Sequence, residues 1–352
     1  MRIINTLFAW AALLLCSTSL FAHDFEVEGI YYNIASSEEK TVGVTYKGND
    51  YESYTDEYSG LVVIPETVTY KGNVYRVIRI EGDAFYECSS LTSVVIPNTV
   101  TYIDHYAFGC SGLTSVVIPN SVESMGADVF GDCPNLTSVV IGNSVTSIGD
   151  YTFKGCSALT SVVIPNNVTS IGRSAFKDCF ALTSVEIGKG VLSIGEHAFR
   201  ECSDLSSLVI PNNVTSIGDY AFFWCSGLTS VVIGNGVESI GSFAFSDCMN
   251  LTKIICNAIT PPTCGTQVFD YIDKNTTTLM VPNGAMSAYQ SAAQWSDFFN
   301  IEHIPTSIEG VKAEARGDGT SPVYNLQGVR VQGTDNLPAG IYIRGGKKFM
   351  VK

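Results

Sequence analysis

The sequence predicts a solenoid, in which short coils stack their strands into a parallel ladder. The first observation is a repeat, whose clearest copy is LTSVVIPNNVTSIGRSAFKDC from Leu159 to Cys179. Further copies begin at Leu91, Leu113, Leu136, Leu182, Leu205 and Leu228. Most copies start 23 residues after the previous one, and a residue is missing from a loop among the N-terminal copies. The second observation is energetic. Burying the apolar side chains of one coil cannot offset the entropy lost on ordering it, so coils fold only by sharing faces with neighbours.

Each coil is expected to begin with a short strand. Its L-x-x-V-x-I spacing ends in an alternation of period two, which is typical of a strand. Proline or glycine then stops the strand, as at Pro165 and Gly188. A bend follows at the Ile-Gly pair, and the spacing x-x-Ala-Phe-x-x-Cys predicts one helical or 3₁₀ turn. The fold class is therefore a parallel β ladder on one face, with short helical or 3₁₀ turns and loops on the other.

Two columns of the repeat are predicted to form internal ladders. The phenylalanines of the Ala-Phe pairs should make an aromatic spine in the core. They are Phe85, Phe108, Phe130, Phe153, Phe176, Phe199, Phe222 and Phe245. Asparagines follow the strands, where their amides can satisfy backbone groups of their own coil and the next. They are Asn98, Asn120, Asn143, Asn166, Asn212 and Asn235.

The chain has 11 cysteines, eight of which are assigned to one repeat column. These eight are Cys88, Cys110, Cys133, Cys156, Cys179, Cys202, Cys225 and Cys248. Pointing inward between stacked coils, they are expected to be buried free thiols that fill space as small apolar groups. Cys256 and Cys264 lie outside the column, and a disulfide between them is left open as an alternative.

The consensus LTSVVIPNxVTSIGxxAFxxCxx resembles the BspA-like leucine-rich repeats of bacterial surface proteins. The resemblance covers an array at residues 61–257, and FEVEGIYYNI…VVIPETVTYKGNVYRV is similar to the N-terminal cap of that family. It implies a leucine-rich repeat solenoid. It also implies a surface-associated protein that takes part in adhesion or binds host proteins.

An open solenoid exposes its core at both ends, so caps are expected. Residues 23–60, rich in tyrosine, should cover the first coil. Residues 258–304 should close the last coil with a short helix from about Ala285 to Phe298. Three side chains share one face of that predicted helix: Tyr289, Ala292 and Trp295.

Residues 1–22 predict a secretory signal. Arg2 precedes an apolar run from Leu7 to Leu15 that is too short to span a membrane, and cleavage is expected after Ala22. Lipidation of Cys16, which follows three leucines, is the alternative. The protein is therefore expected to be exported to the outer surface or the extracellular space, without membrane insertion.

The C-terminal residues differ from the repeat. Residues 305–322 predict a linker, and residues 323–352 predict a β-hairpin with strands at Gly340–Arg344 and Lys348–Lys352. The string YNLQGxxV…LPxGIYI…GKKxxVK resembles the C-terminal sorting domain of type IX secretion substrates. An inert hairpin is the alternative.

Charge and residue pattern narrow the function classes. There are 34 acidic and 20 basic side chains, a net charge of −14, which disfavours nucleic acid and anionic membranes as partners. The four histidines are scattered, and no Asp-rich calcium loop is present, so no metal or cofactor is expected. Serine and threonine are abundant because the repeat contains them, without an adjacent base. The sequence therefore predicts no catalytic site and no enzyme.

The open sheet is one candidate binding surface. If Val94 and Ile96 and their equivalents in the other coils point inward, the residue between them points outward. This outward column, called the valine strip here, consists of Val95, Val117, Val140, Val163, Glu186, Val209 and Val232. Contiguous exposed apolar surface often marks an interaction site. The alternative is that uniform β-branched residues only stabilise the ladder.

An aromatic row is the second candidate. It lies one residue before the Ala-Phe pair and consists of Tyr106, Tyr151, His197, Tyr220 and Phe243. Such rings could stack on sugars, and packing between adjacent coils is the alternative. The sequence thus favours a binding or adhesion protein that presents a repetitive surface to a protein or glycan. A structural protein that self-associates through its sheet is the second hypothesis.

Overall fold

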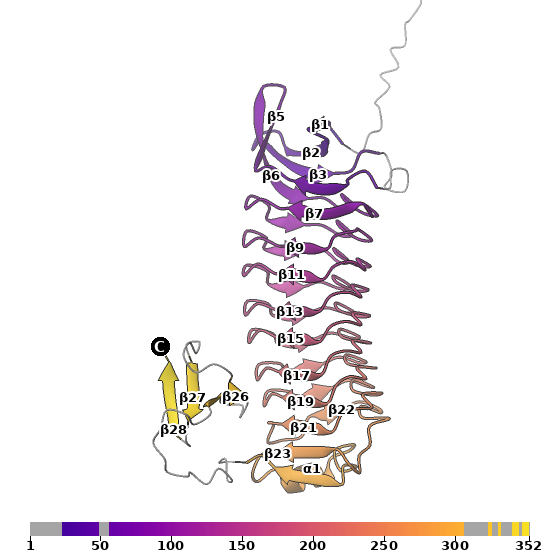
Figure 1. Cartoon of the computed structure of the whole chain (residues 1–352), viewed down its shortest axis with the longest axis vertical. Helices are drawn as coiled ribbons and strands as arrows, with labels where there is room; N and C mark the ends of the chain where they lie inside the picture. Colours follow the sequence, from indigo (N-terminus) through magenta and orange to yellow (C-terminus); the bar gives the residue numbers. More distant parts are fainter. Residues whose placement is uncertain are drawn as a thin grey trace, which may run out of the picture.

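Strands of successive coils lie side by side along the long axis of the molecule (Figure 1). The computed structural model describes residues 23–48 and 56–305 and, beyond them, the strands of a small C-terminal sheet. The chain is a parallel β-solenoid of about ten turns with almost no helix, which confirms the predicted fold class.

The first ladder is built from the L-x-x-V strands and repeats in register. Ser138 is opposite Ser115 and Ser161, and Val140 is opposite Val117. One run of this ladder holds β4 (Gly60–Val63), β7 (Leu91–Val95), β9 (Ser115–Val117), β11 (Ser138–Val140), β13 (Ser161–Val163) and β15 (Ser184–Glu186). A second run holds β17 (Ser207–Ile210), β19 (Ser230–Ile233), β21 (Lys253–Cys256), β23 (Thr278–Val281) and β24 (Asn300–His303).

A second ladder, absent from the sequence prediction, lies where each coil has its Ser-Ile-Gly segment. Its strands are only two residues long, as in the pairing of Ser193 and Ile194 with Ser216 and Ile217. They are β12 (Ser147–Ile148), β14 (Ser170–Ile171), β16 (Ser193–Ile194), β18 (Ser216–Ile217), β20 (Ser239–Ile240) and β22 (Thr263–Cys264). What we expected to be a bend is therefore a second hydrogen-bonded side of the coil.

The third side is made of turns, and the expected helical or 3₁₀ turn is not a helix. Lys177 N–H donates to the Ser174 carbonyl and Cys179 N–H to the Phe176 carbonyl, both three residues back. Ser174 and Asp178 have left-handed backbone with φ of 53° and 62°, which breaks any helix. The Phe176 N–H donates instead to the Ala198 carbonyl of the next coil at 2.7 Å. This side therefore also contributes inter-coil hydrogen bonds.

The aromatic spine is confirmed. Consecutive rings from Phe85 to Phe245 lie 4.9–5.4 Å apart and within 14° of parallel. The stack continues to Phe269, and its two ends are covered by Tyr58 and Trp295, whose rings are tilted. Each of the phenylalanines is fully buried. The spine thus runs through the whole array and beyond the predicted repeats.

The asparagine ladder is confirmed at alternate coils. The side-chain oxygens of Asn120, Asn166 and Asn212 accept the backbone N–H of the equivalent residue in the next coil, at 2.8–3.2 Å. All three asparagines follow a proline, and the residue that donates follows a glycine. These side chains therefore join coils in pairs at the end of the strand.

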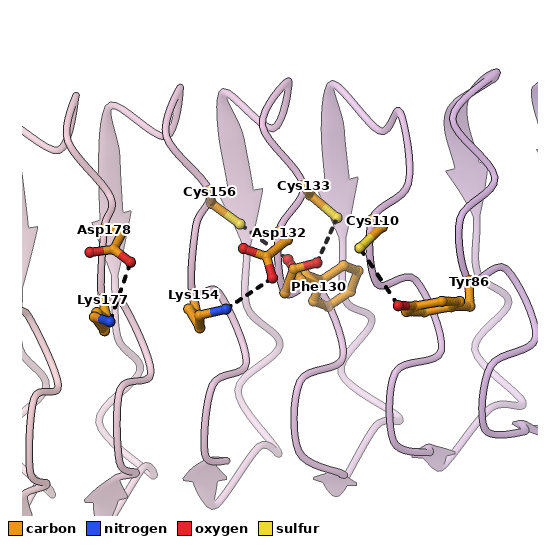
Figure 2. A network of polar contacts seen from close by, with 10 residues as sticks. Tyr86, Cys110, Phe130, Asp132, Cys133, Lys154, Cys156, Lys177 and Asp178 are labelled. Atoms are coloured by element: carbon orange, nitrogen blue, oxygen red, sulfur yellow. Dashed lines mark hydrogen bonds and ion pairs between the residues drawn. The ribbon is translucent and has the colours of Figure 1, made fainter.

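The cysteine column is a hydrogen-bonded ladder rather than an apolar filler. The thiols of Cys156, Cys179, Cys202 and Cys225 each donate to the carbonyl of the spine phenylalanine in the preceding coil at 3.2 Å. Figure 2 shows this contact between Cys156 and Phe130. Every cysteine in the described residues is a free thiol, including Cys256 and Cys264, so the alternative disulfide does not form.

The assignment of Cys110 to this column is wrong. Its N–H donates to the Gly131 carbonyl, and its φ is 55°, which places it one residue earlier in the turn than the other cysteines. Ser111 occupies the column instead, buried and 3.4 Å from the Cys133 sulfur. This coil is one residue shorter than the 23-residue coils, and the deletion lies after Ser111. The spacing of the repeat alone could not show on which side of the cysteine the deletion lies. Cys110 is half-buried, and its sulfur faces the Tyr86 hydroxyl (Figure 2).

The N-terminal residues extend the second ladder with antiparallel strands. β1 (Phe25–Val27), β2 (Ile30–Ser36) and β3 (Thr41–Thr45) form a meander. β3 then pairs in parallel with β6 (Asn73–Ile80), which also pairs with β5 (Thr67–Tyr70). The same sheet ends with β8 (Tyr102–Ile103) and β10 (Ser124–Met125). That this segment serves as a cap stays a prediction.

The expected C-terminal helix is shorter than predicted. It spans only α1 (Met286–Ser291), has no side-chain cap at Ala285 and no acidic residue in its first turn. At Ala292 the backbone is extended, and at Gln294 it is left-handed. Trp295 is nevertheless fully buried, and its indole N–H is satisfied by donating to the Pro262 carbonyl at 2.9 Å. The chain turns here as in the other coils.

The C-terminal sheet has four strands. These are β25 (Val323–Asn325), β26 (Arg330–Val331), β27 (Gly340–Arg344) and β28 (Lys347–Val351). β27 and β28 are antiparallel partners at the position of the predicted hairpin. The predicted signal and linker lie outside the described residues. No helix within the described part of the chain has the length and apolar character that spanning a membrane requires.

Candidate binding surfaces

The valine strip lies on the outer face of the first ladder. Val117, Val140, Val163 and Val209 are each 58–59% exposed, while their strand neighbours point into the core. Val95 is 48% exposed, Glu186 is exposed and Val232 is half-buried. Strand register therefore sets a continuous row of apolar methyl groups along the first run of the ladder. The row extends toward the N-terminus through Val63, which is opposite Val95.

Threonine hydroxyls beside the strip are used by the scaffold. The hydroxyls of Thr114, Thr137, Thr160 and Thr183 each donate to the backbone carbonyl of the equivalent residue one coil earlier, at 3.0–3.4 Å. Their hydrogens are therefore not offered to a ligand. The face is thus a flat apolar row beside hydroxyls that are already engaged.

Glu186 interrupts the strip where the ladder itself is interrupted. Val163 is opposite Glu186, and the first run of strands ends at that residue. The next strand, β17, begins the second run. Glu186 thus places a charged side chain at the boundary between the valines of the first run and those of the second run.

The aromatic row is stacked on itself in its C-terminal half. The rings of His197 and Tyr220 are 4.9 Å apart, as are those of Tyr220 and Phe243, and both pairs are close to parallel. Tyr220 therefore has both faces covered, as the packing alternative describes. Tyr106 is 45% exposed, and Tyr151 is half-buried. All five residues have left-handed backbone, with φ between 56° and 60°.

Burial shifts the pKa of one histidine of the row and of the thiols in the core. Burial lowers the pKa of His197 even though Glu196 lies 3.1 Å from its Nε2. Burial raises the pKa of the Cys133 thiol to about 11 and that of Cys225 to about 12, which keeps both protonated near neutral pH. Within the described residues, no three His, Cys, Asp or Glu side chains are grouped to hold a metal.

Sequence reasoning missed a hollow of about 420 Å³ on the turn side of the solenoid. Its lining residues are Phe180, Glu201, Ser203, Trp224, Ser226 and Met249. The sequence did contain a sign of this hollow. Phe180, Trp224 and Met249 differ from the small or acidic residues that most coils have in the same columns. Only the structure shows that the three departures meet.

The fold and its outward columns define a leucine-rich repeat solenoid. The family model for the BspA type leucine rich repeat region matches residues 78–206 and 193–315 with six copies. The chain belongs to this family.

Solved structures of other proteins are similar to the chain. A leucine rich cell surface protein from Faecalibacterium prausnitzii is 23% identical with a TM-score of 0.53, over 80% of this chain and 95% of the other. A leucine-rich repeat protein from Bacteroides ovatus is 22% identical with a TM-score of 0.47, over 76% of this chain and 81% of the other. No curated protein matches the chain.

Proposed function

We propose that the protein is an exported bacterial surface protein that binds protein or glycan ligands through its repetitive solenoid surface. The observation that carries this proposal is the valine strip, because contiguous exposed apolar surface often marks an interaction site. Proteins with BspA-type repeats are typically found at the cell surface, and the family is generally not enzymatic. Both facts support a binding role.

The uniformity of the strip favours a broad contact. Val117, Val140, Val163 and Val209 have nearly equal exposure, so the coils that carry them present almost the same apolar surface. Affinity would therefore come from several weak contacts that act together on one extended ligand. Glu186 lies between Val163 and Val209 and interrupts this surface.

Placing lysines at the centre of the strip is expected to weaken such a contact. In the double variant Val140→Lys/Val163→Lys, binding of the full chain to immobilised extracellular matrix proteins should weaken at least tenfold, because two buried charges would oppose the interface. Surface plasmon resonance measures this directly. The matched control is Thr146→Lys/Thr169→Lys, which adds the same charge to exposed positions in the same coils, outside the strip.

A self-assembling structural protein is the second candidate, since an apolar strip can pair with its own copy. Sedimentation velocity over a concentration series separates the two candidates. If the wild type self-associates, the strip variant does not, and both bind matrix proteins and glycans equally or not at all, the strip serves assembly and the ligand-binding proposal fails for this face.

We further propose that residues 1–22 direct export and that the C-terminal residues 323–352 are a type IX sorting domain. The four-stranded sheet β25–β28 supports a folded module there, and the sequence resemblance supports its role. Deleting residues 305–352 should leave the protein inside the outer membrane, as protease shaving of intact cells would detect. Normal surface exposure of the truncated protein would eliminate the sorting role.

A further inference from the structure

The hollow on the turn side is formed by four consecutive coils. Phe180, Ser203, Ser226 and Met249 occupy the same repeat position, directly after the cysteine column. The two serines are the small residues in the middle, and the larger Phe180 and Met249 are the end walls. Trp224 and Glu201 occupy the position directly before the cysteine and line the side. Its volume of about 420 Å³ is within the range of small-molecule sites.

The apolar residues of the hollow are not explained by the scaffold. Phe180, Trp224 and Met249 are 44%, 49% and 59% exposed, although the repeat has serine, glycine or an acidic residue at most equivalent positions. Trp224 also has left-handed backbone with φ of 59°, a conformation that favours glycine, asparagine or aspartate. The left-handed conformation recurs at this repeat position, as at Asp178 and Glu201, so the exposed indole rather than the backbone sets Trp224 apart from them.

The polar groups of the hollow are partly free. The Ser203 hydroxyl donates to the Phe180 carbonyl at 3.3 Å, and Glu201 pairs with Arg200 at 2.9 Å. By contrast, the Trp224 indole N–H and the Ser226 hydroxyl make no hydrogen bond within the part of the chain that the structure describes. A ligand can therefore use both.

This combination of groups selects the chemistry of the occupant. A purely apolar occupant would bury the indole N–H and the Ser226 hydroxyl without a hydrogen-bond partner, which is costly for each group. A small ion would make no use of the exposed indole, phenyl and thioether. A pyranose ring satisfies both kinds of group, because it has an apolar C–H face and a belt of hydroxyls that donate and accept.

We propose that this hollow, the Trp224 site, binds a neutral hexopyranose unit of a glycan, with its C–H face on Trp224 and its hydroxyls toward Ser226 and Glu201. The inference rests on the proposed function, for which it names one ligand class at a surface separate from the valine strip. Glu201 and the net charge of −14 disfavour sugars that have a carboxylate, such as uronic and sialic acids.

The test is a glycan array probed with the full chain, followed by fluorescence titration with the strongest neutral oligosaccharide. Trp224→Asp restores a residue found at the same position in other coils, such as Asp178, so the fold should be retained. The matched control is Tyr271→Asp, because Tyr271 occupies the same repeat position, is 74% exposed and has φ of 58°, yet lies outside the hollow.

We expect neutral glycans to bind, their sialylated and uronic acid counterparts to bind more weakly, and Trp224→Asp to raise the dissociation constant at least tenfold. Tyr271→Asp should change it less than twofold. Equal binding by Trp224→Asp, no binding of any neutral glycan, or Trp224-dependent binding of peptides alone would each overturn the proposal. The strip variant Val140→Lys/Val163→Lys should keep glycan binding, so a failure at one surface is distinguishable from a failure at the other.

Discussion

Replacing Phe176 by alanine is expected to lower the free energy of unfolding by about 3–5 kcal/mol. The ring is fully buried and lies 5.3 Å from that of Phe153 and 5.1 Å from that of Phe199. Its removal leaves two ring faces without a partner and a cavity in the middle of the spine. The backbone N–H and carbonyl of residue 176 keep their bonds to Ala198 and Cys202, so the coil cannot easily collapse into the space.

The position of Phe176 in the array adds a second expectation. In a solenoid each coil is stabilised mainly by its two neighbours, so a weak central coil uncouples the two halves. Guanidinium denaturation followed by circular dichroism should show a lower midpoint and a broader or split transition. The control is Val163→Ala, whose side chain is 59% exposed and which should cost less than about 1 kcal/mol. Equal losses for the two variants would contradict a spine that stabilises the array.

The repeat made much of the fold predictable, because identical coils bring identical columns together. The phenylalanine spine, the asparagine contacts and the outward direction of the valines all follow from period-two alternation and a fixed step along the chain. For the same reason the sequence could place Val140 beside Val117 without any knowledge of the turns.

What the sequence could not predict depends on backbone conformation. The turn at Phe176 has i→i+3 hydrogen bonds like a 3₁₀ helix, but left-handed residues at Ser174 and Asp178 separate them. The side-chain spacing is the same in both cases, so the pattern could not distinguish them. Cys110 was misplaced because a single deletion in the turn can be put before or after the cysteine.

The candidate surfaces show the same division. Columns that repeat in every coil, such as the valine strip, were predictable in position but carry no sign of a specific ligand. The Trp224 site arises from three departures that belong to two columns and three coils. These three side chains meet only because of how the turns of neighbouring coils stack. A repeat consensus does not contain residues that differ from coil to coil, so it could not predict the site.

The glycine of the Ile-Gly pair, expected only to bend the chain, is the second position where a small change should have a large effect. We expect Gly195→Ala to lower the free energy of unfolding by about 3 kcal/mol. A Cβ built at Gly195 would lie 2.7 Å from the carbonyl carbon and 2.8 Å from the carbonyl oxygen of Gly172, and 2.9 Å from the Arg173 nitrogen. All three atoms are backbone, so no side-chain rotation can relieve the contact. Thermal denaturation of the variant measures the loss.

The absence of a Cβ at Gly195 also explains why the coils can stack so closely at the second ladder. Gly195 N–H donates to the Ile171 carbonyl at 2.8 Å, and a methyl group would have to stretch that hydrogen bond or tilt the coil. Gly82→Ala is the control, since its nearest contact is a single backbone oxygen at 3.3 Å and its cost should stay below about 1 kcal/mol. If Gly195→Ala were as stable as this control, the spacing of the second ladder would have to be adjustable, and the Ile-Gly pair would again be only a bend.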